Sequence, residues 1–265
     1  MTHYKITKTE VAYLAALKHE YLQQCISPLD GMWEHFVGLA DHYAIACDDT
    51  VIGYCAVNAE QKLLQFYIIG AHDAAFILSQ LISELKISGA FLASSEMHAL
   101  AVCMDHQVSV TVNALMYHTA PDTAAPKASF PNGAQFKSIA AVQLQDAVEF
   151  VYETLGMDID WLKGYLADLI AKGELFGLWL DHKLIATGER RVSASQTPFA
   201  DVGMIVGTNH RGKGLATNML VQLRQLCEEE GRKAICSTER DNVAAQKAIS
   251  RAGFVSHQRI LEFTF

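Results

Sequence analysis

A short glycine-rich turn is the first stretch of this sequence whose residue types and spacing point to chemistry. Residues 207–214 read GTNHRGKG, and apolar residues then recur at helical spacing from Leu215 to Cys227. The first turn of a helix presents amide N–H groups without intrahelical partners and the positive end of the helix dipole, and glycine lets a ligand approach the backbone closely. Arg211 adds a guanidinium fork suited to phosphate oxygens. The stretch therefore predicts a pyrophosphate site.

The same stretch is close to the nucleotide-binding P-loop pattern, GxxxxGK[ST], and departs from it at one position. Gly214 stands where the pattern has Ser or Thr, whose hydroxyl ligates magnesium. Glycine has no side chain with which to ligate a metal, and no GxGxxG sequence follows an early strand. These departures disfavour ATP, GTP and dinucleotides, and they favour a pyrophosphate bound without metal.

Two short motifs resemble those of the GNAT superfamily, the GCN5-related N-acetyltransferases. Arg211, Gly214 and Ala216 fill the motif A signature [RQ]xxGx[GA], and Val206 stands where the family's strand residue usually lies. The segment DNVAAQKAISRAGF is similar to motif B, NxxAxxxYxxxGF, at Asn242, Ala245, Gly253 and Phe254. It follows a predicted strand, as the family's motif does.

The resemblance implies that acetyl-CoA, or another acyl-CoA, binds as co-substrate where two central strands, ending near Val206 and Glu239, splay apart. No metal is expected. The backbone N–H groups of residues 212–216 would hold the pyrophosphate. Asn242 would contact the pantetheine arm or cap the short helix that follows it, and both alternatives stay open. The full set implied to bind acetyl-CoA is Met204, Ile205, Val206, Arg211, Gly212, Lys213, Gly214, Leu215, Ala216, Thr217, Asn242 and Ala245.

Acyl transfer from a thioester to an amine needs an uncharged nucleophile, donors for the developing oxyanion and a proton for the departing thiolate. Three carboxylates are candidates for the general base: Glu189 on a hairpin strand, Asp201 on the strand before the turn, and Glu239 at the end of the next strand. Each is also compatible with a structural carboxylate paired with an arginine such as Arg190 or Arg191. The sequence does not choose among them.

The motif B tyrosine, the family's usual proton donor, is absent because Ile249 occupies its position. Solvent, a bound water or a substrate group would then protonate the thiolate, which slows the reaction without forbidding it. The leading hypothesis is an acyltransferase that transfers an acetyl group to a primary amine of a small molecule by direct attack in a ternary complex. The alternative is a non-catalytic acyl-CoA-binding or regulatory module.

Residues 155–165, LGMDIDWLKGY, occupy the region that covers the acceptor in similar proteins. Asp158, Asp160 and Trp161 would suit a cationic amine with an apolar body. Trp161 is also compatible with packing in the core.

The elements that must position these residues occur twice. The hairpins at residues 44–55 and 177–188 match at an offset of 133 residues, and the strand ends YIIG and MIVG match at an offset of 137. At the second offset, the residues of motif A correspond to Ala74, Ile77 and Ser79, so the first half lacks the phosphate turn. The repeat predicts a tandem duplication with one degenerate copy.

The predicted fold class is α/β (α+β), with two tandem GNAT-like domains. Each is expected to have a mixed, largely antiparallel central sheet flanked by helices. The degenerate domain spans residues 1–119 and the acetyl-CoA-binding domain spans residues 135–265. A proline-rich linker, residues 120–134, joins them.

Composition narrows the partners. Of 265 residues, 51% are hydrophobic and 19% charged, which is typical of a globular protein, and the net charge of −8 argues against nucleic-acid binding. The six cysteines form no CxxC pair, so neither a metal site nor a disulfide framework is indicated. The start has no signal-peptide pattern and no apolar run is of membrane-spanning length. We expect a cytoplasmic monomer or homodimer that binds a small-molecule amine and no membrane.

Overall fold

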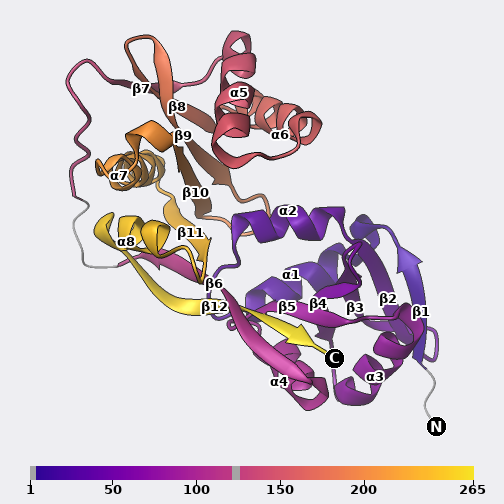
Figure 1. The fold of residues 1–265 in the computed structure, drawn as a ribbon. Helices are drawn as coiled ribbons and strands as arrows, with labels where there is room; N and C mark the ends of the chain where they lie inside the picture. Colours follow the sequence, from indigo (N-terminus) through magenta and orange to yellow (C-terminus); the bar gives the residue numbers. More distant parts are fainter. Residues whose placement is uncertain (1–3, 121–125) are drawn as a thin grey trace. The chain divides into compact units, whose positions relative to one another are not determined.

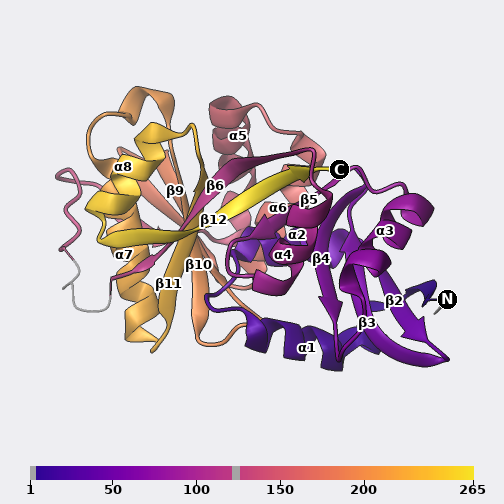
Figure 2. The same ribbon diagram turned by 90° about the horizontal axis from the view of Figure 1, so that it is seen from below.

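The computed structural model describes residues 4–120 and 126–265, and the chain divides into two compact units (Figures 1 and 2). The N-terminal unit runs to Met116 and also contains His257–Phe265, and the C-terminal unit is Tyr117–Ser256. Residues 121–125 of the predicted linker lie outside the described residues. Its described residues, 120 and 126–134, form no helix or strand.

The N-terminal unit is an open sheet with helices on both faces. Its strands follow the order β1-β2-β3-β4-β5-β12-β6. Neighbours from β1 to β4 are antiparallel, and β4 and β5 are parallel. Its elements in chain order are β1 (Tyr4–Thr9), η1 (Val11–Leu14), α1 (Ala15–Gln24), α2 (Gly31–Leu39), β2 (Asp41–Cys47), β3 (Thr50–Val57), β4 (Lys62–Ile68), α3 (Ala74–Leu85), β5 (Gly89–Ala93), α4 (Met97–His106) and β6 (Ser109–Thr119).

The C-terminal unit repeats this plan with the strand order β11-β10-β9-β8-β7. Here too the neighbours are antiparallel except for one parallel pair, β10 with β11. Its elements are β7 (Gln135–Ser138), η2 (Ala141–Gln143), α5 (Leu144–Leu155), α6 (Ile159–Ala171), β8 (Leu175–Leu180), β9 (Lys183–Val192), β10 (Phe199–Val206), η3 (Thr208–His210), α7 (Leu215–Glu229), β11 (Lys233–Glu239), α8 (Val243–Arg251) and β12 (Phe254–Thr264).

The two hairpins that suggested a duplication have the same backbone geometry. Asp48 and Asp49 at the tip of β2–β3 have φ of 46° and 63°, and Asp181 and His182 at the tip of β8–β9 have φ of 48° and 63°. Left-handed residues at both central positions match the twist of a two-residue hairpin. Each hairpin also carries a register shift, between Ile45 and Ala46 in one and between Leu178 and Trp179 in the other. The prediction of two tandem domains of mixed, largely antiparallel architecture is confirmed.

The last strand belongs to both units. β12 begins in the C-terminal unit, and its residues Ile260–Thr264 pair antiparallel with β5 of the N-terminal unit. Phe263 is fully buried in the core of the N-terminal unit. The sequence predicts that residues 257–265 belong to the C-terminal domain, whereas the structure places them in the N-terminal unit. The residues of a strand show which positions face a core and do not show which strand lies beside it.

Each sheet buries apolar side chains on both faces. In the N-terminal unit one core lies under α3 and α4 and the other under α1 and α2. In the C-terminal unit α5 and α6 cover one face, whereas α7 packs on a second core with β8 to β10. Within the described ranges, no helix combines the length and apolar character needed to span a membrane.

Candidate functional site

The glycine-rich turn lies between β10 and α7. Gly212 and Gly214 both have φ of +76°, a conformation that favours glycine. Gly214 is the N-cap of α7 and has no side chain, so no N-cap side chain accepts from the first backbone N–H groups of α7. A Cβ on Gly212 would meet nothing within 4 Å. The open backbone fits the close approach of a pyrophosphate.

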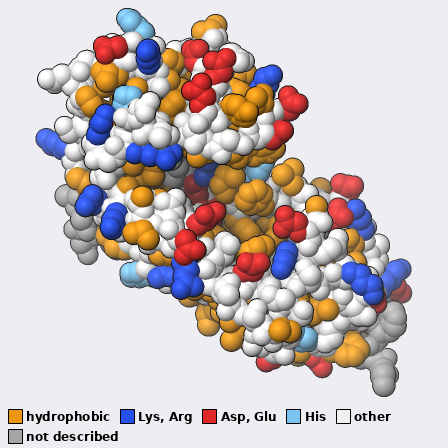
Figure 3. Space-filling view, viewed as in Figure 1, with side chains coloured by type: hydrophobic (Ala, Val, Ile, Leu, Met, Phe, Trp, Pro, Cys, Tyr) orange, Lys and Arg blue, Asp and Glu red, His pale blue; other side chains and the backbone are white. Residues whose placement is uncertain are grey.

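Two cationic side chains hold the turn in shape. Arg211 Nε donates to the carbonyl oxygen of Val206 at 3.2 Å, which ties the turn to the end of β10. Lys213 Nζ donates to the carbonyl oxygen of Asn209 at 3.1 Å. Figure 3 shows Lys and Arg side chains gathered over α7 and α8 on the face in view, whereas Asp and Glu gather with hydrophobic side chains over α5 and α6. The charge around the turn suits an anion although the chain is acidic.

The equivalent helix of the N-terminal unit is closed to an anion. Asp73 is the N-cap of α3, and its Oδ1 accepts from the backbone N–H of Phe76 at 2.9 Å. A carboxylate thus occupies the end of α3 that corresponds to the bare end of α7. Of these two equivalent helices, α3 has a side-chain cap at its N-terminus and α7 has none.

The two strands beside the turn, β10 and β11, separate from each other, as the family resemblance implies. β10 and β11 pair in parallel only through Phe199↔Lys233, Ala200↔Ala234 and Asp201↔Ile235. β10 then continues to Val206 and β11 to Glu239. Met204, Ile205 and Val206, which were expected to face the pantetheine arm, lie on the part of β10 beyond this pairing.

The motif B residues form the start of α8. Asn242 Oδ1 accepts from the backbone N–H of Ala245 at 3.1 Å, so the helix-cap alternative describes the structure. Thr217 Oγ1 donates to the carbonyl oxygen of Ala248 at 3.4 Å and links α7 to α8. Ile249, at the position of the family's tyrosine, is 2% exposed and packs in the interior, whereas Ser250 is exposed.

Two of the three candidate bases lie together on one face of the C-terminal sheet. Asp201 and Arg191 are direct partners across β10 and β9, and Glu189 is two residues further along β9. Residues two apart on a strand share a face, so all three side chains converge. Arg191 pairs with Glu189 through Nη1 and with Asp201 Oδ1 through Nη2 at 2.5 Å. The arginine that the sequence offered as a structural partner therefore binds both carboxylates.

A tyrosine that no sequence motif includes completes this group. Tyr165 of α6 donates from its hydroxyl to Glu189 Oε2 at 2.6 Å and accepts from Arg191 Nη1 at 3.0 Å. Burial, and then the charge of Glu189, raise the pKa of Tyr165, so its hydroxyl stays protonated near neutral pH. We call Tyr165, Glu189, Arg191 and Asp201 the carboxylate cluster.

Trp161 connects the predicted acceptor segment to the carboxylate cluster. Its ring stacks on Tyr165 with the centroids 4.8 Å apart and the planes at 14°. The two residues lie four apart on α6, and this spacing places side chains on one face of a helix. That spacing is the signal from which Tyr165 was predictable. Asp158 caps α6 by accepting from the Trp161 N–H at 2.8 Å, and Asp160 is exposed in the first turn.

The third candidate base lies apart from this cluster. Glu239 is exposed at the end of β11, four residues beyond Ile235, the partner of Asp201. At about 3.3 Å per residue this is roughly 13 Å along the strand. The described residues contain no group of three or more His, Cys, Asp and Glu side chains placed to hold a metal ion.

Comparisons with known proteins identify the family of both units. Family models described as acetyltransferase (GNAT) domains match residues 10–120 and 138–255. An acetyltransferase from the GNAT family of Colwellia psychrerythraea is 36% identical, with a TM-score of 0.90 over 98% of this chain and 99% of that one. No match to a curated protein sequence was found.

More distant structures share the fold. A tandem GNAT protein from the clavulanic acid biosynthesis pathway is 12% identical, with a TM-score of 0.72 over 99% of this chain and 98% of that one. A GCN5-related N-acetyltransferase from Sphaerobacter thermophilus is 14% identical, with a TM-score of 0.70 over 98% and 94%. The two matched domains and the Colwellia relative show that the chain belongs to the GNAT acetyltransferase family.

Proposed function

We propose that the C-terminal unit transfers an acetyl group from acetyl-CoA to a primary amine of a small molecule, by direct attack while both are bound. The observation that carries the proposal is the contrast between the two equivalent helix ends. Gly214 leaves the end of α7 bare, whereas Asp73 fills the end of α3 with its own carboxylate. Only the first is suited to the pyrophosphate of acetyl-CoA.

Acetyl-CoA supplies an acyl group activated as a thioester. The backbone N–H groups of residues 212–216 would hold its pyrophosphate, and Arg211 would add a positive charge there. The backbone of β10 from Met204 to Val206 would orient the pantetheine arm. On α8, Asn242 and Ala245 contribute through the shape of the helix start, because their side-chain and backbone groups bond to each other.

Among the carboxylates, Glu189 is the one that we propose as the proton acceptor for the attacking amine. Its side chain is 11% exposed, whereas that of Asp201 is 2% exposed and lies deeper. Gly203 faces Glu189 across the strands, and a Cβ there would come within 4.0 Å of Glu189 Oε2. The glycine keeps the space beside the carboxylate open. Asp201 then acts by holding Arg191 in place.

The charge and shape of the surroundings favour a cationic acceptor. Two carboxylates and one guanidinium leave the carboxylate cluster with one net negative charge. Trp161, whose ring stacks on Tyr165, is 37% exposed, and we propose that an ammonium group approaches the other face of its ring. Asp158 and Asp160 add negative charge at the start of α6.

The motif B position does not supply a proton to the leaving CoA thiolate. Ile249 is buried and cannot donate a proton, so water protonates the thiolate. Since a free thiol has a pKa of about 8.5, the CoA thiolate is an adequate leaving group near neutral pH. We therefore expect turnover to be modest rather than absent.

Release of free CoA from acetyl-CoA, measured with amino acids, polyamines, aminoglycosides and peptide amines, tests the proposal. With an amine that is accepted, Glu189→Gln should lower kcat by about 10²- to 10⁴-fold, since it removes the base. It should leave acetyl-CoA affinity unchanged. Glu239→Gln is the matched control on the neighbouring strand and should keep its activity.

The outcomes separate the alternatives. If Glu239→Gln loses activity and Glu189→Gln does not, the base is misassigned. If the wild type binds acetyl-CoA and releases no CoA with any amine, the chain is a non-catalytic acyl-CoA-binding module. The buried Ile249 is the one observation that favours this second function.

A further inference from the structure

The described part of the linker, residues 126–134, runs beside the turn that we propose for acetyl-CoA. Pro126 lies just after α8, since a Cβ added to Gly253 would be 3.6 Å from its Cδ. Phe130 packs on the second core of the C-terminal unit, to which Leu215 of α7 also belongs. The segment between Pro126 and Phe130 is therefore held at both ends, next to α7 and α8.

A hydrogen bond joins this segment to α7. The backbone N–H of Ser129 donates to Asn218 Oδ1 at 2.9 Å. The same side chain also reaches the turn, because Asn218 Nδ2 donates to the carbonyl oxygen of Gly214 at 3.1 Å. An amide side chain offers an acceptor and a donor on one planar group, so a single residue can make both bonds. Asn218 is thus a bridge between the linker and the N-cap of α7.

The bridge orients one of the groups that we propose to hold the pyrophosphate. The carbonyl of Gly214 accepts from both the backbone N–H and the side-chain Nδ2 of Asn218, each at 3.1 Å. This carbonyl and the N–H of Leu215 belong to one planar trans peptide, so they point in opposite directions. Because the carbonyl is directed into the helix, the N–H of Leu215 is directed out of the helix end, where a bound anion would lie.

The turn benefits from such support because its residues have wide backbone freedom. Gly212 and Gly214 both have φ of +76°, and glycine loses more conformational freedom than any other residue when it is fixed. A second hydrogen bond on the Gly214 carbonyl restricts the peptide that follows it. A turn that already has its bound shape loses less entropy when the ligand binds.

The equivalent helix of the N-terminal unit lacks a residue that could form this bridge. Asn218 is the fourth residue after the N-cap of α7. The fourth residue after the N-cap of α3 is Ile77, which is fully buried and has no polar side-chain atom. The amide therefore occurs in the copy that has the open turn, and an apolar core residue replaces it in the copy whose helix end is closed by Asp73.

We propose that Asn218 is a positioning residue of the acetyl-CoA site and that the linker supports it. With Ser129 bound, the Asn218 amide keeps its Nδ2 on Gly214 and the N–H of Leu215 in the direction that the pyrophosphate needs. The inference rests on the proposed function, since it takes acetyl-CoA as the ligand of the turn. Docking of the linker on Asn218 and binding of acetyl-CoA then stabilise each other, because a coupling between two equilibria acts in both directions.

Calorimetric titration with acetyl-CoA tests the role of Asn218. Asn218→Ala removes both hydrogen bonds of the bridge and should weaken binding about five- to tenfold, since the net contribution of one hydrogen bond corresponds to about fivefold. Gln222→Ala is the matched control, because Gln222 is half-buried on α7 one turn further from Gly214, and it should bind as the wild type does. With an amine that is accepted, Asn218→Ala should raise the KM for acetyl-CoA by more than it lowers kcat, whereas a general loss of structure would lower kcat as well.

Variants of Ser129 test the support from the linker. Ser129→Pro removes the N–H donor and should weaken binding about fivefold, whereas Ser129→Ala keeps the N–H and should bind more tightly than Ser129→Pro. The chain that combines Ser129→Pro with Asn218→Ala should bind about as weakly as Asn218→Ala alone, because the two changes break the same bridge. Losses that multiply would show two independent effects.

Trypsin measures the reciprocal effect on the linker. Lys127 is exposed in the same segment, and trypsin cleaves after lysine. Saturating acetyl-CoA should slow cleavage after Lys127 about fivefold in the wild type, since cleavage follows the population of undocked linker. In Asn218→Ala, acetyl-CoA should leave the rate of this cleavage unchanged. Mass spectrometry of the fragments identifies the cleaved bond.

Three results would overturn the inference: Asn218→Ala binds acetyl-CoA like the wild type, the losses of Asn218→Ala and Ser129→Pro multiply, or acetyl-CoA slows cleavage after Lys127 equally in the wild type and in Asn218→Ala. If the wild type binds no acetyl-CoA, the inference and the proposed function both fail. If the wild type binds acetyl-CoA and Asn218→Ala binds it equally well, this inference fails alone.

Discussion

Replacement of Gly214 by aspartate should abolish acetyl-CoA binding, because it reproduces at α7 the capped helix end found at α3. Gly214 has φ of +76°, where a residue with a side chain is strained by roughly 1–2 kcal/mol. A carboxylate about 5 Å from a pyrophosphate with two negative charges costs a further ~1.7 kcal/mol even at the dielectric constant of water. The strain counts against binding because the free turn of the variant relaxes out of this conformation and binding must restore it. The sum near 3 kcal/mol then weakens binding by about 100-fold.

Calorimetric titration with acetyl-CoA measures this loss, and two variants separate its causes. Gly214→Ala carries the backbone strain without the charge and should bind more weakly than the wild type and more tightly than Gly214→Asp. Gly156→Asp carries the same strain and charge at the C-cap of α5, where φ is +70° and a Cβ meets nothing within 4 Å. It should bind acetyl-CoA normally. An affinity of Gly214→Asp within twofold of the wild type would refute the assignment of the turn.

Three further predictions concern both units. The chain should bind one acetyl-CoA rather than two, because Asp73 closes the equivalent helix end of the N-terminal unit, and a calorimetric stoichiometry of two would contradict this. Arg191→Met should lower the free energy of unfolding by about 3 kcal/mol, since it leaves Glu189 and Asp201 buried without their cation. Denaturant unfolding measures this loss, with the exposed Lys163→Met as control. Equal stabilities of the two variants would show that the cation is not needed. Burial raises the pKa of Glu96 to about 8 in the folded state, so its contribution to stability is complete below about pH 4.5 and is lost as the pH rises through 8. The free energy of unfolding of the wild type relative to Glu96→Gln should therefore fall over this range. A constant difference would argue against the buried carboxyl.

The parts of this protein that were predictable from sequence are those encoded by neighbouring residues. The turn of residues 207–214 and the start of α7 follow from glycine, arginine and an apolar helical pattern within a few positions. The hairpin tips at Asp48 and Asp181 recur because a two-residue turn with left-handed backbone has a narrow choice of residues. The family and the two-domain plan follow from these local patterns.

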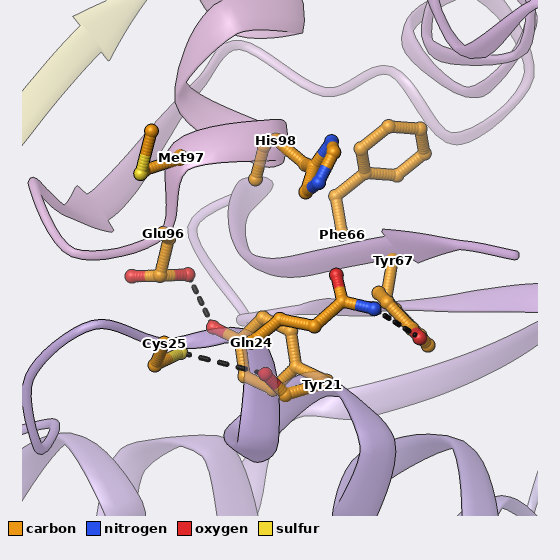
Figure 4. Close-up of a pocket in the computed structure, with 9 residues that line it drawn as sticks. Tyr21, Gln24, Cys25, Phe66, Tyr67, Glu96, Met97 and His98 are labelled. Atoms are coloured by element: carbon orange, nitrogen blue, oxygen red, sulfur yellow. Dashed lines mark hydrogen bonds between the residues drawn. The ribbon is translucent and has the colours of Figure 1, made fainter.

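The positions of the side chains that we propose for chemistry depend on contacts between residues that are distant in sequence. Asp201 meets Arg191 because β9 and β10 are register partners, and Tyr165 reaches Glu189 from a helix 24 residues away in sequence. The small pocket of the N-terminal unit, shown in Figure 4, depends on a contact between Tyr21 and Glu96, which lie 75 residues apart. None of these contacts produces a periodic pattern in the sequence, so the sequence does not choose among the three carboxylates.

The sequence by itself determined the cofactor-binding motif, the half of the chain that carries it and the duplicated plan, because each is written in residues that lie within one turn, hairpin or helix. Only the tertiary structure decided which carboxylates share an arginine, where β12 pairs, and that a buried acid lines a pocket in the half without the motif. The physical reason is that strand register and side-chain burial depend on what the rest of the chain brings alongside a residue, and this information is absent from its neighbours in sequence.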